Sequence, residues 1–171
     1  MKKFTLLGVV ALLAITGCKQ KPQASEPQIS SEARAQALQL ASEGEFSTQV
    51  HDFAAAEQSL VKAIALDPTI PRYWKELGSA RKHLGKTEDA RAAYQKSYDL
   101  LEAARKKDAG SGGLVLGEVE TLVLMGKNDE AKELLNKTVK DHPQDQTLQQ
   151  MVKNNIVDKM AADPTIKASI L

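Results

Sequence analysis

Three histidines, His51, His83 and His142, are the side chains of this sequence best suited to bind a metal or to transfer a proton. They fall in separate loops or helix ends, and none has a second His or Cys at the spacing of a zinc site. With so few histidines no Ser/His/Asp set can be singled out, and no acidic pair stands out from an ordinary solvated helix surface. We therefore predict no catalytic residue, no metal and no cofactor, and we expect that the protein is not an enzyme.

Two glycine-containing stretches have the residue types of phosphate-binding loops. Gly85-Lys86-Thr87 matches the end of a P-loop, but the earlier glycine that the motif requires falls at Ala80, and a helix rather than a strand precedes it. Gly110-Ser111-Gly112-Gly113 lacks the third glycine of a dinucleotide-binding fingerprint and follows no strand. We interpret the first stretch as a corner between helices and the second as a hinge or a helix C-cap.

The single cysteine, Cys18, ends an apolar run near the N-terminus. Lys2 and Lys3 precede this run, and residues 4–15 are too few to span a bilayer as a mature helix. Ile15-Thr16-Gly17-Cys18 resembles the bacterial lipobox, which implies a signal peptide at 1–17 and a lipidated, palmitate-bearing cysteine. A buried thiol or an ordinary signal anchor is the alternative, but the position of the cysteine directly before a polar tract favours the lipobox.

Residues 19–30 are rich in Gln, Pro, Ser and Lys, a composition typical of a disordered tether, so 18–30 is predicted to be a lipidated cysteine and its linker. The three acyl chains that the lipoprotein resemblance implies would hold the protein on a membrane without further help, because two or more chains bind stably. Lys19 rather than Asp follows the cysteine. A lysine at this position is similar to enterobacterial sorting signals, and the similarity implies that the protein is in the outer membrane and faces the periplasm.

Charge and composition narrow the class of protein further. The 171 residues include 23 Lys and Arg and 22 Asp and Glu, and removal of the signal peptide with its two lysines leaves a net charge of −1. A near-neutral chain lacks the excess positive charge that general nucleic-acid binding requires. Only 4% of the residues are aromatic, whereas Ala, Leu, Glu, Lys and Gln are abundant, so we predict an all-α fold with one modest core or a short repeat array.

The stretch 71–98 predicts an antiparallel helix pair around the turn at 84–86. Small residues, Gly78 and Ala90, stand where the two helices must come closest. Trp74, Leu77 and Tyr94 fill the space above and below them. A pair of this size leaves an apolar face bare, so it needs stacked neighbours.

The same pattern recurs when Ala56, Ala90 and Ala131 are aligned, with spacings of 34 and 41 residues. A helix pair every 34 residues resembles the tetratricopeptide repeat. The resemblance implies a right-handed α-solenoid of about three helix pairs within 31–143, divided near 37–70, 71–111 and 112–145. The seven extra residues of the second spacing predict an overlong second helix in the central pair.

Residues 145–160 have apolar side chains at helical spacing and predict one amphipathic helix. Because the end of a repeat array needs a cover, we assign 145–171 to a capping helix and a tail. Within this tail, Asp163-Pro164-Thr165-Ile166 repeats the sequence of Asp67-Pro68-Thr69-Ile70 and could begin a last short turn.

In the tetratricopeptide family the first helix of each pair lines a concave groove. The positions that the resemblance turns inward in the central pair are Arg72, Lys75, Glu76, Ser79, Lys82 and His83. The basic side chains among them could hold an acidic or carboxylate-bearing peptide, although Ser79 replaces the Asn of the family's carboxylate clamp. The alternative is that these charges form only the solvated side of an amphipathic helix.

The corresponding positions of the third pair form an apolar strip. They are Gly113, Leu116, Gly117, Glu120, Val123 and Leu124. Either the C-terminal helix or a partner helix covers this strip, and we favour the internal cover because such a patch rarely stays bare.

These features together predict a lipid-anchored protein of the bacterial cell envelope that acts as a protein–protein interaction scaffold or assembly factor. It is similar in layout to tetratricopeptide lipoproteins that assist secretin or pilus assembly. The expected partners are envelope proteins or peptide segments, not nucleic acid, and the membrane through the lipid anchor. The alternative function is a regulatory adaptor that docks peptidoglycan-modifying enzymes or proteases, and a homo-oligomer also remains open.

Overall fold

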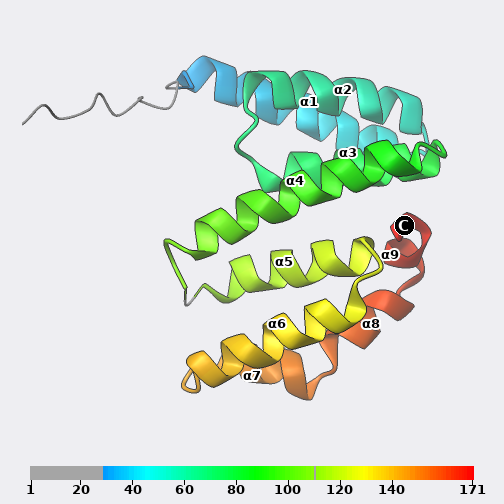
Figure 1. Cartoon of the computed structure of the whole chain (residues 1–171). Coiled ribbons are helices and arrows are strands. Elements are labelled where there is room, and N and C mark those ends of the chain that lie inside the picture. The colour runs from blue at the N-terminus through cyan, green and yellow to red at the C-terminus, as the bar shows by residue number, and fades with distance from the viewer. Residues whose placement is uncertain (1–28, 110) are drawn as a thin grey trace, which may run out of the picture.

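A computed structural model describes residues 29–109 and 111–171, so Cys18, the predicted signal peptide and most of the predicted tether lie outside the described residues. The described residues form helices and no strand, and the first six helices make three antiparallel pairs that stack one upon the next (Figure 1). The helices are α1 (Ser31–Gln49), α2 (Phe53–Leu66), α3 (Pro71–His83), α4 (Thr87–Arg105), α5 (Gly112–Leu124), α6 (Asn128–Asp141), α7 (Gln146–Lys153), α8 (Ile156–Ala162) and α9 (Pro164–Ser169).

The beginnings of the first helices follow from single residues in the sequence. The side chain of Ser30 accepts a hydrogen bond from the amide of Ala33 at 3.1 Å, and Asp52 accepts one from the amide of Ala55 at 3.0 Å. Each bond satisfies an amide that would otherwise have no partner in the first turn of a helix. Pro71 begins α3 because its fixed φ suits the first helical position.

The corners of the second and third pairs share one backbone geometry. Gly85 and Gly126 have positive φ angles of 75° and 73°. After each glycine, the next amide donates back to the helix, from Lys86 to the carbonyl of Arg81 and from Lys127 to the carbonyl of Leu122, both at 2.9 Å. This is the Schellman arrangement that ends many helices, so the interpretation of residues 85–87 as a helix corner is confirmed.

His51 occupies the same corner position in the first pair, which the sequence had not revealed. Its φ is 61°, and the amide of Asp52 donates to the carbonyl of Ser47 at 2.8 Å, as in the two glycine corners. A residue with a side chain pays an energetic cost in this left-handed conformation that glycine avoids. The three helix pairs therefore share one corner geometry although their residues differ.

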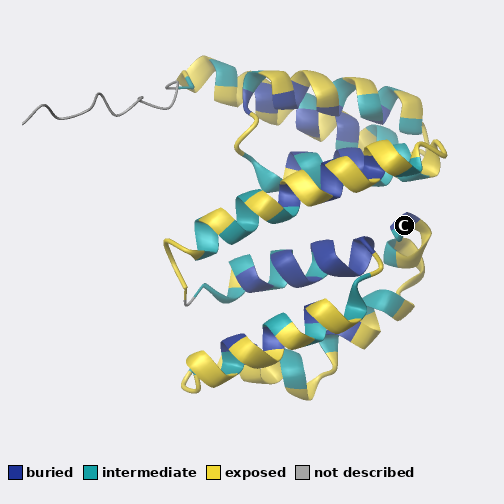
Figure 2. Cartoon of the chain, in the orientation of Figure 1, coloured by how far each residue is buried: buried dark blue, intermediate teal, exposed yellow. Residues whose placement is uncertain are grey.

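Helices α3 and α4 approach each other closely at Gly78. A Cβ atom built there would lie 2.5 Å from ring atoms of Tyr94, whose side chain is fully buried. Tyr94 belongs to the apolar cluster of the C-terminal half, whereas Leu77 and Ala93 belong to the cluster of the N-terminal half. The predicted close approach at Gly78 is confirmed, but the nearest atoms to a Cβ there belong to the ring of Tyr94, which was expected above or below this point. Figure 2 shows buried residues in both α4 and α5.

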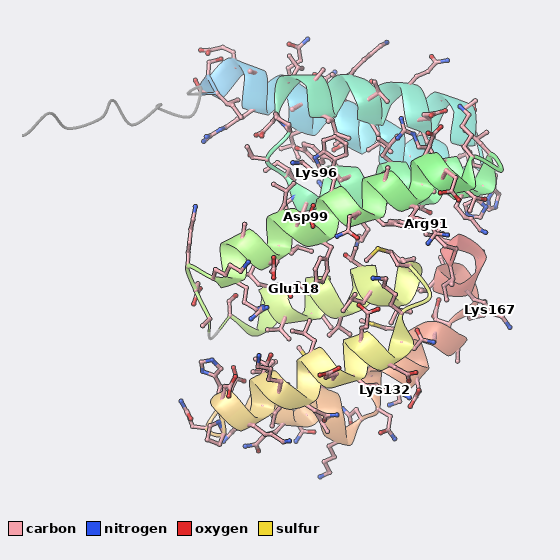
Figure 3. The ribbon with its side chains drawn as sticks, viewed as in Figure 1. Arg91, Lys96, Asp99, Glu118, Lys132 and Lys167 are labelled. Atoms are coloured by element: carbon pink, nitrogen blue, oxygen red, sulfur yellow. The ribbon has the colours of Figure 1, made fainter. Side chains whose placement is uncertain are left out.

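The second helix of the central pair is overlong, as predicted, with 19 residues in α4 against 14 in both α2 and α6. Its last turn carries Arg105, whose Nε donates to the buried carboxylate of Glu118 at 2.6 Å. Figure 3 shows Glu118 on the side of α5 that faces α4. The prediction that the glycine run caps α4 is wrong for Gly112 and Gly113, because these residues form the first turn of α5.

The C-terminal segment folds into three short helices rather than the single helix predicted for 145–160. The helix is interrupted between α7 and α8 because Asn155 has a positive φ of 51°. Leu148 of α7 and Val157 of α8 are buried in the C-terminal part of the core, and Lys132 pairs with Asp158 at 2.6 Å. The segment therefore covers the end of the array, as predicted, but with three helices.

We predict that Gly78→Ala lowers the free energy of unfolding by about 1–3 kcal/mol, because the added methyl group overlaps the Tyr94 ring. Urea unfolding followed by far-UV circular dichroism measures the change. Gly113→Ala is the matched control: it adds the same methyl group to a helix where no atom lies within 4 Å, and it should raise stability by about 0.4–1 kcal/mol. Equal effects of the two substitutions would contradict the close-approach interpretation.

Candidate functional site

Ion pairs join the first helices of the three pairs on one side of the array. Arg72 of α3 pairs with Glu45 of α1 and lies 3.5 Å from the carboxylate of Glu76. The Nζ atom of Lys75 donates to Oε1 of Glu120 on α5 at 2.7 Å. We call the surface of α3 and α5 that carries Lys75, Glu76, Ser79 and Glu120 the inner face.

The pairing changes the expected character of this surface. Arg72 and Lys75 were predicted to present basic groups to a partner, but glutamates from α1, α3 and α5 neutralise both of them. No ion pair among the described residues includes Lys82, which is half-buried on the last turn of α3. Of the predicted residues, the structure brings Lys75, Ser79 and Glu120 together on a surface of mixed charge.

The apolar strip of the third pair is covered by the C-terminal segment. Val123 was predicted to line the groove, but its side chain is fully buried, so it cannot contact a partner in this conformation. Leu124 is also buried, whereas Leu116 is half-buried and Glu120 reaches Lys75. Apolar residues of α8 and α9 pack against the cluster that contains Val123 and Leu124, so the internal cover is confirmed for this end of the strip.

Helix α9 lies against the inner face, between the C-terminal halves of α3 and α5 (Figure 1). The hydroxyl oxygens of Ser79 and Ser169 are 2.7 Å apart, and the buried hydroxyl of Tyr94 donates to the carbonyl oxygen of Ser169 at 2.9 Å. Beyond the helix, the amide of Leu171 donates to the carbonyl oxygen of Leu124 at 3.0 Å. Ser79 and Ser169, which are about ninety positions apart, therefore lie in contact, and the sequence did not reveal this contact.

A cavity of about 180 Å³ remains between α9 and the inner face. It is lined by Lys75, Glu76, Ser79, Glu120, Leu124, Thr165, Ile166 and Ser169. One carboxylate oxygen of Glu76 is buried without a hydrogen-bond partner. Burial raises the pKa of Glu76 above its usual value, although the positive charges of Arg72 and Lys75 oppose this shift.

Two histidines that are far apart in the sequence lie at the same end of the array. The ring of His83 stacks on Phe53 with centroids 4.1 Å apart, and the ring of His51 lies 5.8 Å from Phe53. Burial lowers the pKa of His83, and the nearby His51 and Lys82 add to this effect. One feature of the sequence could have indicated the position of His51 in this group of rings. When the helix pairs are aligned, His51 falls at the position of Gly85, which is a helix corner.

Other parts of the described chain also contain cavities. A second cavity, of about 240 Å³, lies between α6, α7 and α8, and none of the predicted groove residues lines it. Within residues 29–109 and 111–171, His, Cys, Asp and Glu side chains form no group of three suited to hold a metal ion. The helices of this part of the chain are also too short or too polar for any of them to cross a bilayer.

Helix pairs that stack into an array with one shared inner face define a class of α-helical repeat protein. Residues 71–100 match one sequence model of the tetratricopeptide repeat, and residues 93–156 match another. The protein therefore contains tetratricopeptide repeats, and the predicted α-solenoid fold is confirmed. Such repeats generally bind other proteins, which makes this chain a protein–protein interaction scaffold.

One similar solved structure is the tetratricopeptide domain of OM64 from Arabidopsis. It is 15% identical in sequence, with a TM-score of 0.43, and the match covers 74% of this chain and 98% of that one. A likeness at this level carries no argument about a partner. No curated protein matches the chain.

Proposed function

We propose that this protein is a lipid-anchored scaffold of the bacterial cell envelope and that it binds a protein segment at its inner face. The observation that carries the proposal is the inner face itself, a surface fixed across three helix pairs by the Arg72–Glu45 and Lys75–Glu120 ion pairs. It presents charged and hydroxyl groups beside a cavity of about 180 Å³. Positioned polar groups next to apolar surface are what a peptide-binding groove requires.

The membrane anchor is proposed from the first residues of the sequence. Cys18 follows a basic and then an apolar segment, and the predicted tether of twelve residues would reach roughly 40 Å when extended. That length is enough to hold the folded array clear of lipid headgroups. Lys19 favours the outer membrane with the array in the periplasm, where assembly of a secretin or pilus is one process that such a scaffold would serve.

Cys18→Ser tests the anchor. We expect the altered protein to leave the membrane fraction and to change its mobility on a denaturing gel, because it loses every acyl chain. Ser25→Ala, a change of similar size within the proposed tether, should leave the protein in the membrane fraction. Retention of Cys18→Ser on the membrane in a salt wash would contradict lipid anchoring.

Lys82→Glu tests the inner face as the partner site. It reverses a charge beside Ser79 without breaking an ion pair of the described residues, so we expect at least fivefold less partner to be recovered with the membrane-anchored protein. Lys96→Glu makes the same change on an exposed position of α4 (Figure 3) and should leave recovery unchanged. Equal recovery with both variants would remove the inner face from the proposal.

A further inference from the structure

The segment 163–171 contacts the inner face in the way that a bound peptide does. Two of its contacts involve its main chain, at the carbonyl of Ser169 and the amide of Leu171. A third contact places the small hydroxyl side chain of Ser169 against Ser79. Ile166 and Ile170 add apolar contacts with the core. Main-chain hydrogen bonds and side-chain contacts in pockets are both used in peptide recognition.

This segment is only lightly attached to the rest of the chain. Helix α9 has six residues, and Asp163 alone separates it from α8. Four of its residues, Pro164, Thr165, Lys167 and Ala168, are exposed, and Lys167 extends away from the inner face (Figure 3). Because α9 has only six residues and four of them are exposed, it resembles the parts of proteins that open independently of the core.

Departure of the segment would leave α7 and α8 covering the end of the array. Leu148 of α7 and Val157 of α8 are the buried apolar residues of the C-terminal helices, and both precede Asp163. Lys132 also ties α6 to α8 through Asp158. The cap and the segment 163–171 therefore have separate attachments.

The segment also fits the inner face incompletely. The cavity beside Ile166 and Ser169 stays open, and Glu76, one of its lining residues, has one carboxylate oxygen that is buried without a donor. A buried acceptor that lacks a partner is costly. A different segment that brings a hydrogen-bond donor to Glu76 would satisfy this oxygen and fill the cavity, which gives it an advantage over residues 163–171.

From these contacts we propose that residues 163–171 are an internal ligand of the inner face, and that a partner binds by displacing them. The partner segment carries a small residue at the place of Ser169, aliphatic residues at the places of Ile166 and Ile170, and a hydrogen-bond donor that reaches Glu76. This inference rests on the proposed function, because it assumes that the inner face binds a protein segment. It adds the chemistry of that segment and the way in which access to the site is controlled.

The segment follows α8 directly, and this short connection sets how strongly the site is closed. A ligand held by so short a connection competes at an effective concentration on the order of 1 mM. If the segment occupies the site about 99% of the time, the apparent affinity of a partner falls about 100-fold. Release of the segment should therefore increase the affinity of any competing peptide by a similar factor.

A reversible cross-link between α3 and α9 tests the proposal in the whole chain. The hydroxyl oxygens of Ser79 and Ser169 are 2.7 Å apart, so the double substitution Ser79→Cys/Ser169→Cys, combined with Cys18→Ser, places two thiols within reach of each other. The probe is a fluorescent peptide with the sequence of residues 163–171, and anisotropy measures its binding. We expect the oxidised protein to bind the peptide at least tenfold more weakly than the same protein after reduction. Ser169→Cys alone should bind equally with and without oxidant.

A second comparison avoids the cysteines. Ser169→Arg in the full chain places a large charged side chain where Ser79 leaves little room, so it should expel the segment and increase peptide affinity at least tenfold over the unchanged protein. Unchanged affinity in this variant, or equal binding by the oxidised and reduced proteins, would overturn the proposal.

The outcomes also separate this inference from the function on which it rests. If cross-linked and reduced proteins recover the same envelope partner equally well, the scaffold function stands and control by residues 163–171 fails. If reduction restores peptide binding but neither form recovers an envelope partner, the internal ligand stands and the envelope scaffold fails.

Discussion

The packing of the Tyr94 ring onto Gly78 is the contact on which the rest of the structure depends. The absence of a side chain at Gly78 lets α3 and α4 approach, and the ring that fills the space is fully buried. Its hydroxyl group must then find an acceptor, because a buried polar group without one costs about 1–3 kcal/mol. The carbonyl of Ser169 is that acceptor. A packing requirement in the middle of the array therefore decides where residues 163–171 lie.

The inner face follows from the same arrangement. Stacking of the three pairs brings α1, α3 and α5 side by side, and ion pairs then fix α3 to both neighbours. These pairs remove most of the positive charge that α3 would otherwise present. What remains for recognition is a set of hydroxyl groups, main-chain groups and one unsatisfied carboxylate oxygen beside a small cavity. The shape and hydrogen-bonding groups of a segment therefore contribute more to binding at such a site than its net charge does.

Local patterns in the sequence were enough to predict the helix pairs. Gly78 and Tyr94 stand sixteen residues apart around a glycine corner, and both the close approach and the corner are present. Contacts between distant residues were not predictable in this way, because spacing within a helix says nothing of which carboxylate reaches Lys75 or where Ser169 docks. The repeated Asp-Pro-Thr-Ile sequence was a usable signal. Asp67 and Asp163 both accept hydrogen bonds from the amide two residues later, and a helix begins directly after the first motif and within the second.

The central claim is that residues 163–171 open independently of the repeat core. Native-state hydrogen exchange at low urea tests it most directly, by comparing the amide of Leu171, which donates to Leu124, with the amide of the buried Val123. The claim predicts that Leu171 opens at a cost at least about 2 kcal/mol lower than Val123, with little dependence on urea. In Tyr94→Phe, which removes only the hydroxyl, Leu171 should exchange about fivefold to tenfold faster. Equal opening free energies and equal urea dependence for the two amides would contradict the claim.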